Sequence, residues 1–207
     1  MVRKLSKGAS NKLKAYTLIK EAIIDRRYQP NQFLSENELA EDLGISRTPI
    51  REALQTLEVE GFLSLVPNRG AQVASISSKD VEEIFEIRSL CEQLAASKLI
   101  NNNNSVYLLQ MTKLFQQQKI NKAQNNLVSF IANDREFHLA LIRASENGRL
   151  YTLYNGTRDH LLRLGLEIVA KIPGQMEQSL EEHKKIINAL EGRNSKEVKE
   201  ALMEHLT

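Results

Sequence analysis

Two short helical patterns joined by a tight glycine turn constrain the fold of this chain more than any other feature. The first begins at the capping box Ser35-Glu36-Asn37-Glu38 and ends at Gly44. The second begins at the cap Ser46, accommodates Pro49 in its first turn, and extends to about Glu60. Apolar side chains recur on one face of each pattern, so both helices are expected to pack on a shared core.

A further helix is expected before this pair, and a β-hairpin after it. Residues 12–26 carry apolar side chains three or four positions apart, and the pattern stops before Pro30. Residues 62–66 and 71–74 are predicted strands, with the turn Pro67-Asn68-Arg69-Gly70 between them. This order of elements predicts a winged helix-turn-helix domain over residues 1–76.

The remainder of the chain, residues 77–207, is predicted to be entirely helical, which makes the fold class mainly α. Apolar periodicity indicates six helices, at 78–100, 105–119, 127–145, 148–171, 174–191 and 195–206. Residues 101–104 and the polar segment 121–126 are expected to be solvated. One stripe of the first helix is expected to face inward, and it contains Val81, Ile84, Phe85, Arg88, Cys91, Leu94 and Ala95.

The composition is that of a globular protein. A chain of 207 residues with 42% hydrophobic and 26% charged residues has room for two folded domains. Its single cysteine, Cys91, cannot form an internal disulfide and is expected to be buried without a redox role. There is no stretch of 18 apolar residues and no signal-peptide pattern. We therefore expect a cytoplasmic protein without a membrane partner.

Positive charge is concentrated near the N-terminus. Residues 1–31 contain eight Lys and Arg but only two Asp and Glu, whereas residues 77–207 contain 17 of each kind. Arg47 and Arg51 lie four positions apart and share one helix face, where arginine suits bidentate contact with guanine. Thr48 suits a phosphate, and Arg69 at the hairpin tip suits a minor groove. The alternative is a solvated charged face; the whole arrangement of helices and hairpin favours double-stranded DNA.

The same segment resembles a known family. Residues 45–54, 57–63 and 67–73 are similar to the winged helix of GntR-family bacterial transcriptional regulators. The resemblance implies DNA contacts from Arg47, Thr48, Pro49 and Arg51, with Gly70 at the wing tip. Many relatives carry arginine where this chain has Asn37, whose neutral side chain makes a shorter contact.

The chain has only four histidines, and all lie in the predicted helical part. Asp134 and His138 are four residues apart in the apolar stripe of the helix 127–145. His183 and His205 each replace an apolar residue on the inner face of one of the last two helices. An inward aspartate needs a cation or a hydrogen-bond donor. Together these side chains suit zinc, nickel, copper or iron; the alternative is that the histidines are satisfied core residues.

The segment 78–206 is similar to the FCD effector domain of the FadR subfamily of GntR regulators. Its metal-binding members carry Asp-x-x-x-His on one long helix and one histidine on each of the last two helices. Asp134, His138, His183 and His205 match those positions. The resemblance implies an antiparallel helical bundle that holds a divalent ion, zinc or nickel, with open positions for water or a small carboxylate.

Two further residues are candidates for the effector pocket. The family pattern implies that Arg88 holds the carboxylate of the effector; the alternative is that it pairs with Glu92 or extends to the surface. His160 lies near the inner face of the helix 148–171, where it either lines the pocket or belongs to the core. The chain ends two residues after His205, so this ligand is expected at a fraying helix end.

These features predict a ligand-responsive repressor rather than an enzyme. We expect a homodimer that binds a palindromic operator and responds to a small organic acid. One alternative is a metalloenzyme that activates water, but no acid or base is evident beside the ligands, and the winged helix would be unexplained. The other is a structural DNA-binding protein, which would not need polar residues at core positions.

Overall fold

The chain folds into two compact units. The computed structural model describes residues 10–67, 69–102 and 105–206, and the division lies between Ser77 and Ser78. No helix in the described part of the chain is long and apolar enough to cross a membrane. The expected fold class, a winged helix-turn-helix followed by a helical domain, is confirmed.

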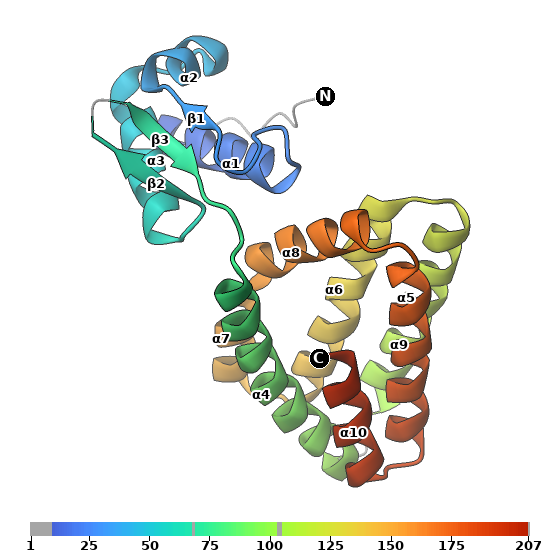
Figure 1. Cartoon of the computed structure of the whole chain (residues 1–207). Coiled ribbons are helices and arrows are strands. Elements are labelled where there is room, and N and C mark those ends of the chain that lie inside the picture. The colour runs from blue at the N-terminus through green and yellow to red at the C-terminus, as the bar shows by residue number, and fades with distance from the viewer. Residues whose placement is uncertain (1–9, 68, 103–104, 207) are drawn as a thin grey trace. The chain divides into compact units, whose positions relative to one another are not determined.

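The first unit packs three helices against a small antiparallel sheet (Figure 1). Its sheet has the order β1-β3-β2, and α1 and α3 form the main helical contact. The elements are α1 (Asn11–Ile24), β1 (Phe33–Leu34), α2 (Glu36–Leu43), α3 (Arg47–Val59), β2 (Leu63–Val66) and β3 (Gly70–Val73).

The tight turn between α2 and α3 forms as the sequence predicts. Ser35 caps α2, although its side chain accepts a hydrogen bond from the Asn37 amide rather than from Glu38, as the capping box would require. Gly44 ends α2 in the left-handed conformation, with φ of 62°. The next amide, from Ile45, donates to the Ala40 carbonyl at 3.1 Å, which closes the helix end.

The strand β1 was not predicted from the sequence. It has only two residues, too few for a periodic pattern, and it pairs with β3 so that Leu34 lies opposite Ala71. Gly70 makes this pairing possible. Its φ is 97°, and a Cβ atom there would lie 2.3 Å from the Leu34 carbonyl oxygen.

The second unit is a bundle of seven helices within the described residues, built around α6 (Figure 1). The central helix packs against α4, α5, α7 and α8, while α9 packs against α5 and α10, and α10 against α4. The elements are α4 (Ser78–Asn102), α5 (Ser105–Ala123), α6 (Leu127–Ala144), α7 (Gly148–Gly156), α8 (Arg158–Lys171), α9 (Gln175–Glu191) and α10 (Ser195–His205).

The prediction of a single helix at 148–171 is wrong, because this segment forms two helices, α7 and α8. The chain breaks at Thr157, whose backbone amide and side-chain hydroxyl both donate to the Tyr154 carbonyl. Gly156 precedes this position and has a low intrinsic helix propensity, so the break costs little.

Two expectations about burial are also wrong. Leu94 was placed on the inner stripe of α4, but it is 46% exposed, and Glu92 lies inward instead with no exposed surface. The polar segment 121–126 was expected to be solvated. In the structure α5 continues to Ala123 and buries Asn121, as well as Gln118 one turn earlier. Glu92 and the Gln118 oxygen have polar partners, which apolar periodicity cannot detect, whereas the buried Nδ2 of Asn121 has no hydrogen-bond partner within the described residues.

Candidate metal centre and nucleic-acid interface

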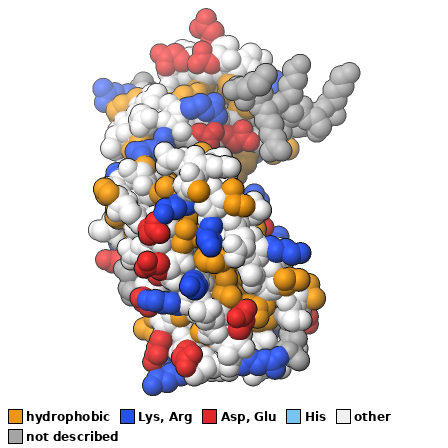
Figure 2. All heavy atoms as spheres, turned by 90° about the vertical axis from the view of Figure 1, so that its right-hand side faces the viewer, with side chains coloured by type: hydrophobic (Ala, Val, Ile, Leu, Met, Phe, Trp, Pro, Cys, Tyr) orange, Lys and Arg blue, Asp and Glu red, His pale blue; other side chains and the backbone are white. Residues whose placement is uncertain are grey.

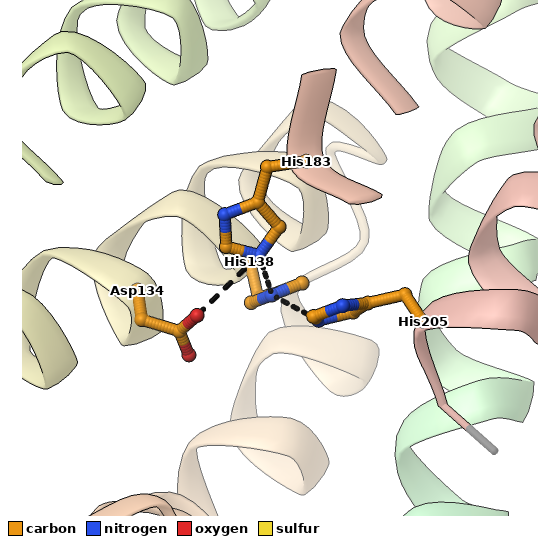
Figure 3. A group of neighbouring side chains, drawn as sticks. All are labelled: Asp134, His138, His183 and His205. Carbon is orange, nitrogen blue, oxygen red and sulfur yellow. Dashed lines mark hydrogen bonds and ion pairs between the residues drawn. The ribbon is translucent and has the colours of Figure 1, made fainter. Parts of the chain in front are cut away.

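Four metal-ligating side chains from three helices meet inside the second unit (Figure 3). Asp134 and His138 come from α6, His183 from α9 and His205 from α10. One ligand atom from each side chain lies within 4.8 Å of all the others. The structure therefore brings together all four residues that the sequence analysis selected as ligands.

The facing atoms of this cluster have the spacing of a coordination shell. His138 Nε2 lies 3.2 Å from His183 Nε2 and 3.1 Å from His205 Nε2. Asp134 Oδ1 lies 3.4 Å from His183 Nε2. Metal bonds of about 2.0–2.2 Å to nitrogen and oxygen place neighbouring donor atoms about 3 Å apart, so the four side chains fit a divalent ion.

Each histidine is oriented by an acceptor on its outer side. The Nδ1 atom of His138 lies 2.9 Å from Glu92 Oε2, and that of His183 lies 2.9 Å from Gln118 Oε1. The Nδ1 atom of His205 lies 2.7 Å from a Glu182 carboxylate oxygen.

Carboxylate and amide oxygens only accept, so each Nδ1 carries the proton and donates. Each Nε2 of a neutral ring then presents a lone pair, and lone pairs directed at one another repel unless a cation lies between them. This tautomer pattern fits a metal site better than a core of satisfied histidines.

Glu92 is the most connected of these acceptors. Its Oε1 accepts from Arg88 Nε at 2.7 Å and from the Tyr154 hydroxyl at 2.8 Å, while its Oε2 accepts from His138. Burial alone would raise the pKa of Glu92, but His138 and Arg88 overcome that effect and hold it below the ordinary value. Glu92 is therefore ionised, and it neutralises the buried Arg88.

The two fully buried histidines are suited to metal ligation at neutral pH. Burial lowers the pKa of His138, and burial also lowers the pKa of His183 well below the ordinary value. Only the neutral form of imidazole has a free Nε2 for a metal. His205, the last residue of α10, is held by Glu182 although it stands at the helix end.

A small cavity of about 80 Å³ adjoins the cluster. Asp134, His138 and His205 form part of its wall, and so does Arg88, which donates from Nη2 to His205 Nε2 at 3.2 Å. Arg88 thus pairs with Glu92, as the alternative expected, and it also lines the cavity, while its contact with a carboxylate stays a prediction. His160 is not among the lining residues, although Leu161 and Leu164 of the same helix are.

The acceptors behind the histidines were missed as functional residues. Glu92 was considered only as a partner of Arg88, and Gln118 lies in a helix whose polar end was expected to be solvated. Glu182 directly precedes His183 in the sequence but accepts a hydrogen bond from His205 on α10. The available signal was a polar residue at an inward helical position, which is the same signal that identified the histidines.

The residues selected for DNA contact surround an open groove in the first unit. This groove, of about 490 Å³, includes Asn37, Arg47, Arg51, Arg69 and Gly70 among its lining residues. The arginines project from the start of α3, with the side chain of Arg47 62% exposed and that of Arg51 58% exposed. Thr48 and Pro49 lie in the same first turn without lining the groove. Asn68, in the predicted turn, is outside the described residues.

Glu36 organises the two arginines of this groove. Arg51 donates from Nε and Nη2 to the two Glu36 oxygens at 2.9 and 2.8 Å, and Arg47 Nη2 lies 3.7 Å from the same carboxylate. The hydrogen bonds from Arg51 hold the pKa of Glu36 below its ordinary value. The bidentate pair fixes the guanidinium of Arg51 on the exposed edge of α3, and Arg47 lies close to the same carboxylate.

The surface of the second unit differs in character from this groove. Figure 2 shows acidic and basic side chains interspersed over one face of it, with hydrophobic side chains between them. Such a mixed face produces no basic stripe that could follow a phosphate backbone. The face in view therefore offers no competing DNA surface.

Both units match known protein families. Residues 11–73 match the family described as bacterial regulatory proteins, gntR family, and residues 83–207 match the FCD domain. The uncharacterized HTH-type transcriptional regulator YdhC of Bacillus subtilis (strain 168) is 30% identical over 209 residues, which cover 98% of this chain and 90% of that protein. The gluconate operon transcriptional repressor of the same organism is 27% identical over 154 residues, 74% of this chain and 63% of that protein. The solved structure of E. coli McbR/YncC has the same fold, with a TM-score of 0.72 at 24% identity over 96% of this chain and 94% of that chain.

Proposed function

Because this chain belongs to the GntR family and carries the FCD domain of the FadR-type subfamily, a family of DNA-binding transcriptional regulators and not of enzymes, we propose that it is a metal-dependent, ligand-responsive repressor. It acts in the cytoplasm and represses a metabolic operon, as the name of the gluconate operon transcriptional repressor of B. subtilis says of that protein. A small carboxylate that binds beside a divalent ion in the second unit changes its affinity for the operator.

The observation that carries this proposal is the orientation of the three histidines. Each Nδ1 is bound to an outer acceptor, so that all three Nε2 atoms and the Asp134 carboxylate face one point. Three imidazoles and one carboxylate suit zinc or nickel. When bound, the ion supplies a Lewis-acidic position for a carboxylate oxygen.

Arg88 is the proposed protein contact for the carboxylate. It is buried, it lines the cavity, and its Nη2 already lies against His205 at the edge of the cluster. Glu92 fixes its Nε, which leaves the terminal nitrogens directed at the cavity to hold an anion. His160, which does not line the cavity, remains a candidate effector contact on α8.

DNA recognition is assigned to the groove of the first unit. Arg47 and Arg51 would read base edges in the major groove, with Thr48, Pro49 and Asn37 at the backbone. Arg69 and Gly70, on the wing, would enter the adjacent minor groove. The exposure of both α3 arginines supports this assignment, since no rearrangement of the unit is needed to present them.

A homodimer is proposed because α4 presents an apolar outer face. Ile87, Leu90 and Leu94 recur three or four positions apart and are exposed, Leu90 at 73%. Leu153 on the neighbouring α7 is exposed as well. Apolar side chains grouped in this way mark an interface, and a twofold dimer would place one winged helix on each half of a palindrome.

Elemental analysis of protein purified without a nickel column tests the metal proposal. We expect about one zinc or nickel ion per chain, and loss of it in His138→Ala, which removes one ligand. His160→Ala serves as the matched control, because that histidine lies outside the cluster, and it should retain the ion. Folded protein without metal, or an His138→Ala variant with full metal content, would refute the proposal.

A further inference from the structure

Arg135 is a second guanidinium in the wall of the cavity beside the metal cluster. Its side chain is only 15% exposed, and its Nε is buried without a hydrogen-bond partner in the described part of the chain. Its Nη2 lies 3.3 Å from Glu136, and the other oxygen of Glu136 lies 3.3 Å from Arg143 Nη1. One carboxylate is thus divided between two arginines, which leaves positive charge at Arg135.

The position of Arg135 on α6 places it beside the metal ligands. Side chains three residues apart on a helix are neighbours, with Cβ atoms about 5–6 Å apart, and Arg135 precedes His138 by three residues. Ile131, one turn earlier, also lines the cavity and provides an apolar floor. A ligand that touches the ion at His138 therefore lies within reach of Arg135.

The charges around the cavity favour an anionic ligand that reaches from the ion to Arg135. A divalent ion held by Asp134 would retain one positive charge, which the Glu182 carboxylate behind His205 partly offsets, while Glu92 neutralises Arg88. Arg135 adds a further positive charge that Glu136 only partly offsets. Most other lining residues are apolar, and Asp134 is the only acidic residue among them, so the remaining positive charge must be met by the occupant.

The cavity volume limits the size of that occupant. One water needs about 10–15 Å³ of such volume, so 80 Å³ accommodates roughly five to eight non-hydrogen atoms. Pockets for drug-sized ligands are larger, at about 300–1,000 Å³. Acyl-CoA and six-carbon sugar acids exceed the available space.

We propose that this site binds a short aliphatic dicarboxylate. One carboxylate lies at the metal and Arg88, and the other pairs with Arg135. The inference rests on the proposed function, because it places the second carboxylate by reference to the first. It adds the class of effector and the residue that selects it.

Calorimetric titration of the zinc-loaded full-length protein tests the proposal, with succinate compared with butyrate and malonate with propionate. Within each pair the chain length is equal and only the second carboxylate differs. We expect the dicarboxylate to bind at least tenfold more tightly, since a charge-assisted hydrogen bond contributes about tenfold to hundredfold in affinity. Zinc content is measured after each titration, to exclude removal of the ion by the acid.

Two variants test whether the preference for the dicarboxylate comes from Arg135 itself or from the overall positive charge of the second unit. Arg135→Gln should abolish the preference for the dicarboxylate. Arg149→Gln removes an exposed arginine of α7 that does not line the cavity, and it should retain the preference. Both variants should keep their zinc, because neither residue is a ligand.

The possible failures are distinguishable. If zinc binds and the two acids of each pair bind equally well, or if Arg135→Gln keeps the preference, the dicarboxylate inference is overturned while the metal-anchored carboxylate site stands. If zinc binds but none of the acids does, the carboxylate effector itself is overturned. If neither zinc nor any acid binds, the proposed function fails together with this inference.

Discussion

Replacement of Glu92 by glutamine should damage both the stability of the second unit and its metal site. The carboxylate has no exposed surface and accepts three hydrogen bonds, from Arg88, Tyr154 and His138. Glutamine keeps the shape but removes the charge, which leaves the Arg88 guanidinium buried without its ion-pair partner. It also places an amide donor against one of the three donors.

The burial of both partners sets the size of the expected loss in the free energy of unfolding. Removal of one partner of a buried ion pair costs about 3–5 kcal/mol. Asp134 is near enough to attract Arg88 and partly replace Glu92, so we expect the lower end, about 3 kcal/mol. Metal affinity should fall by about 10- to 100-fold, because an amide nitrogen facing His138 Nδ1 favours the ring tautomer with its proton on Nε2.

Two measurements on the same variant test these effects separately. Urea denaturation of chelator-treated protein gives the free energy of unfolding, and competition with a chromophoric chelator gives the zinc affinity. Glu86→Gln, an exposed position on the same helix, is the control and should stay within about 0.5 kcal/mol of the unaltered protein. An equally stable Glu92→Gln variant would refute the buried ion pair, and unchanged zinc affinity would refute the role of Glu92 in setting the tautomer.

Further predictions concern the DNA groove, the wing and the response to pH. Arg51→Ala should weaken operator binding by about tenfold to hundredfold and relax base preference at one position of each half-site, measured by fluorescence anisotropy; unchanged discrimination would remove Arg51 from base readout. Gly70→Ala should lower stability by at least about 1–3 kcal/mol in thermal unfolding, because the backbone is left-handed there and the new Cβ would collide with the Leu34 carbonyl; a variant of normal stability would contradict the β1–β3 pairing. Metal-free protein should lose stability as the pH falls below about 6.5, by up to about 1.4 kcal/mol per pH unit for each of His138 and His183, because burial lowers the pKa of both rings and only the unfolded chain takes up the protons. Stability that does not change between pH 7 and pH 5 would show that these rings are protonated in the fold.

Most of the fold was predictable because local signals agreed with one another. The caps at Ser35 and Ser46, the stop at Gly44 and the apolar periodicity of α3 all indicated the same two helices. The cluster of four candidate metal ligands was predictable for a related reason. A polar residue in an otherwise apolar stripe stands out when the stripe itself is regular, as it is around His138.

What the sequence did not predict depends on tertiary partners. Two-residue β1 exists only because β3 pairs with it, and Gln118 is buried only because His183 supplies a donor. The inward position of Glu92 depends on Arg88 and Tyr154, one of which comes from another helix. In a single sequence such polar positions look like surface residues, because the residues that pack against them in the fold are distant along the chain.

The helix α4 has one side that faces the interior of the second unit and another that is exposed. Arg88 faces the cavity and Glu92 is buried beside it, while Leu90 and Leu94 are exposed, and Ser78 at the start of the helix directly follows the first unit. A helix of 25 residues is a rod about 37 Å long that resists bending. In the proposed repressor, an anion that draws on Arg88 would therefore shift this stiff helix as one body, and the same shift would be felt by its outer apolar side chains and at Ser78, where the chain leaves the first unit.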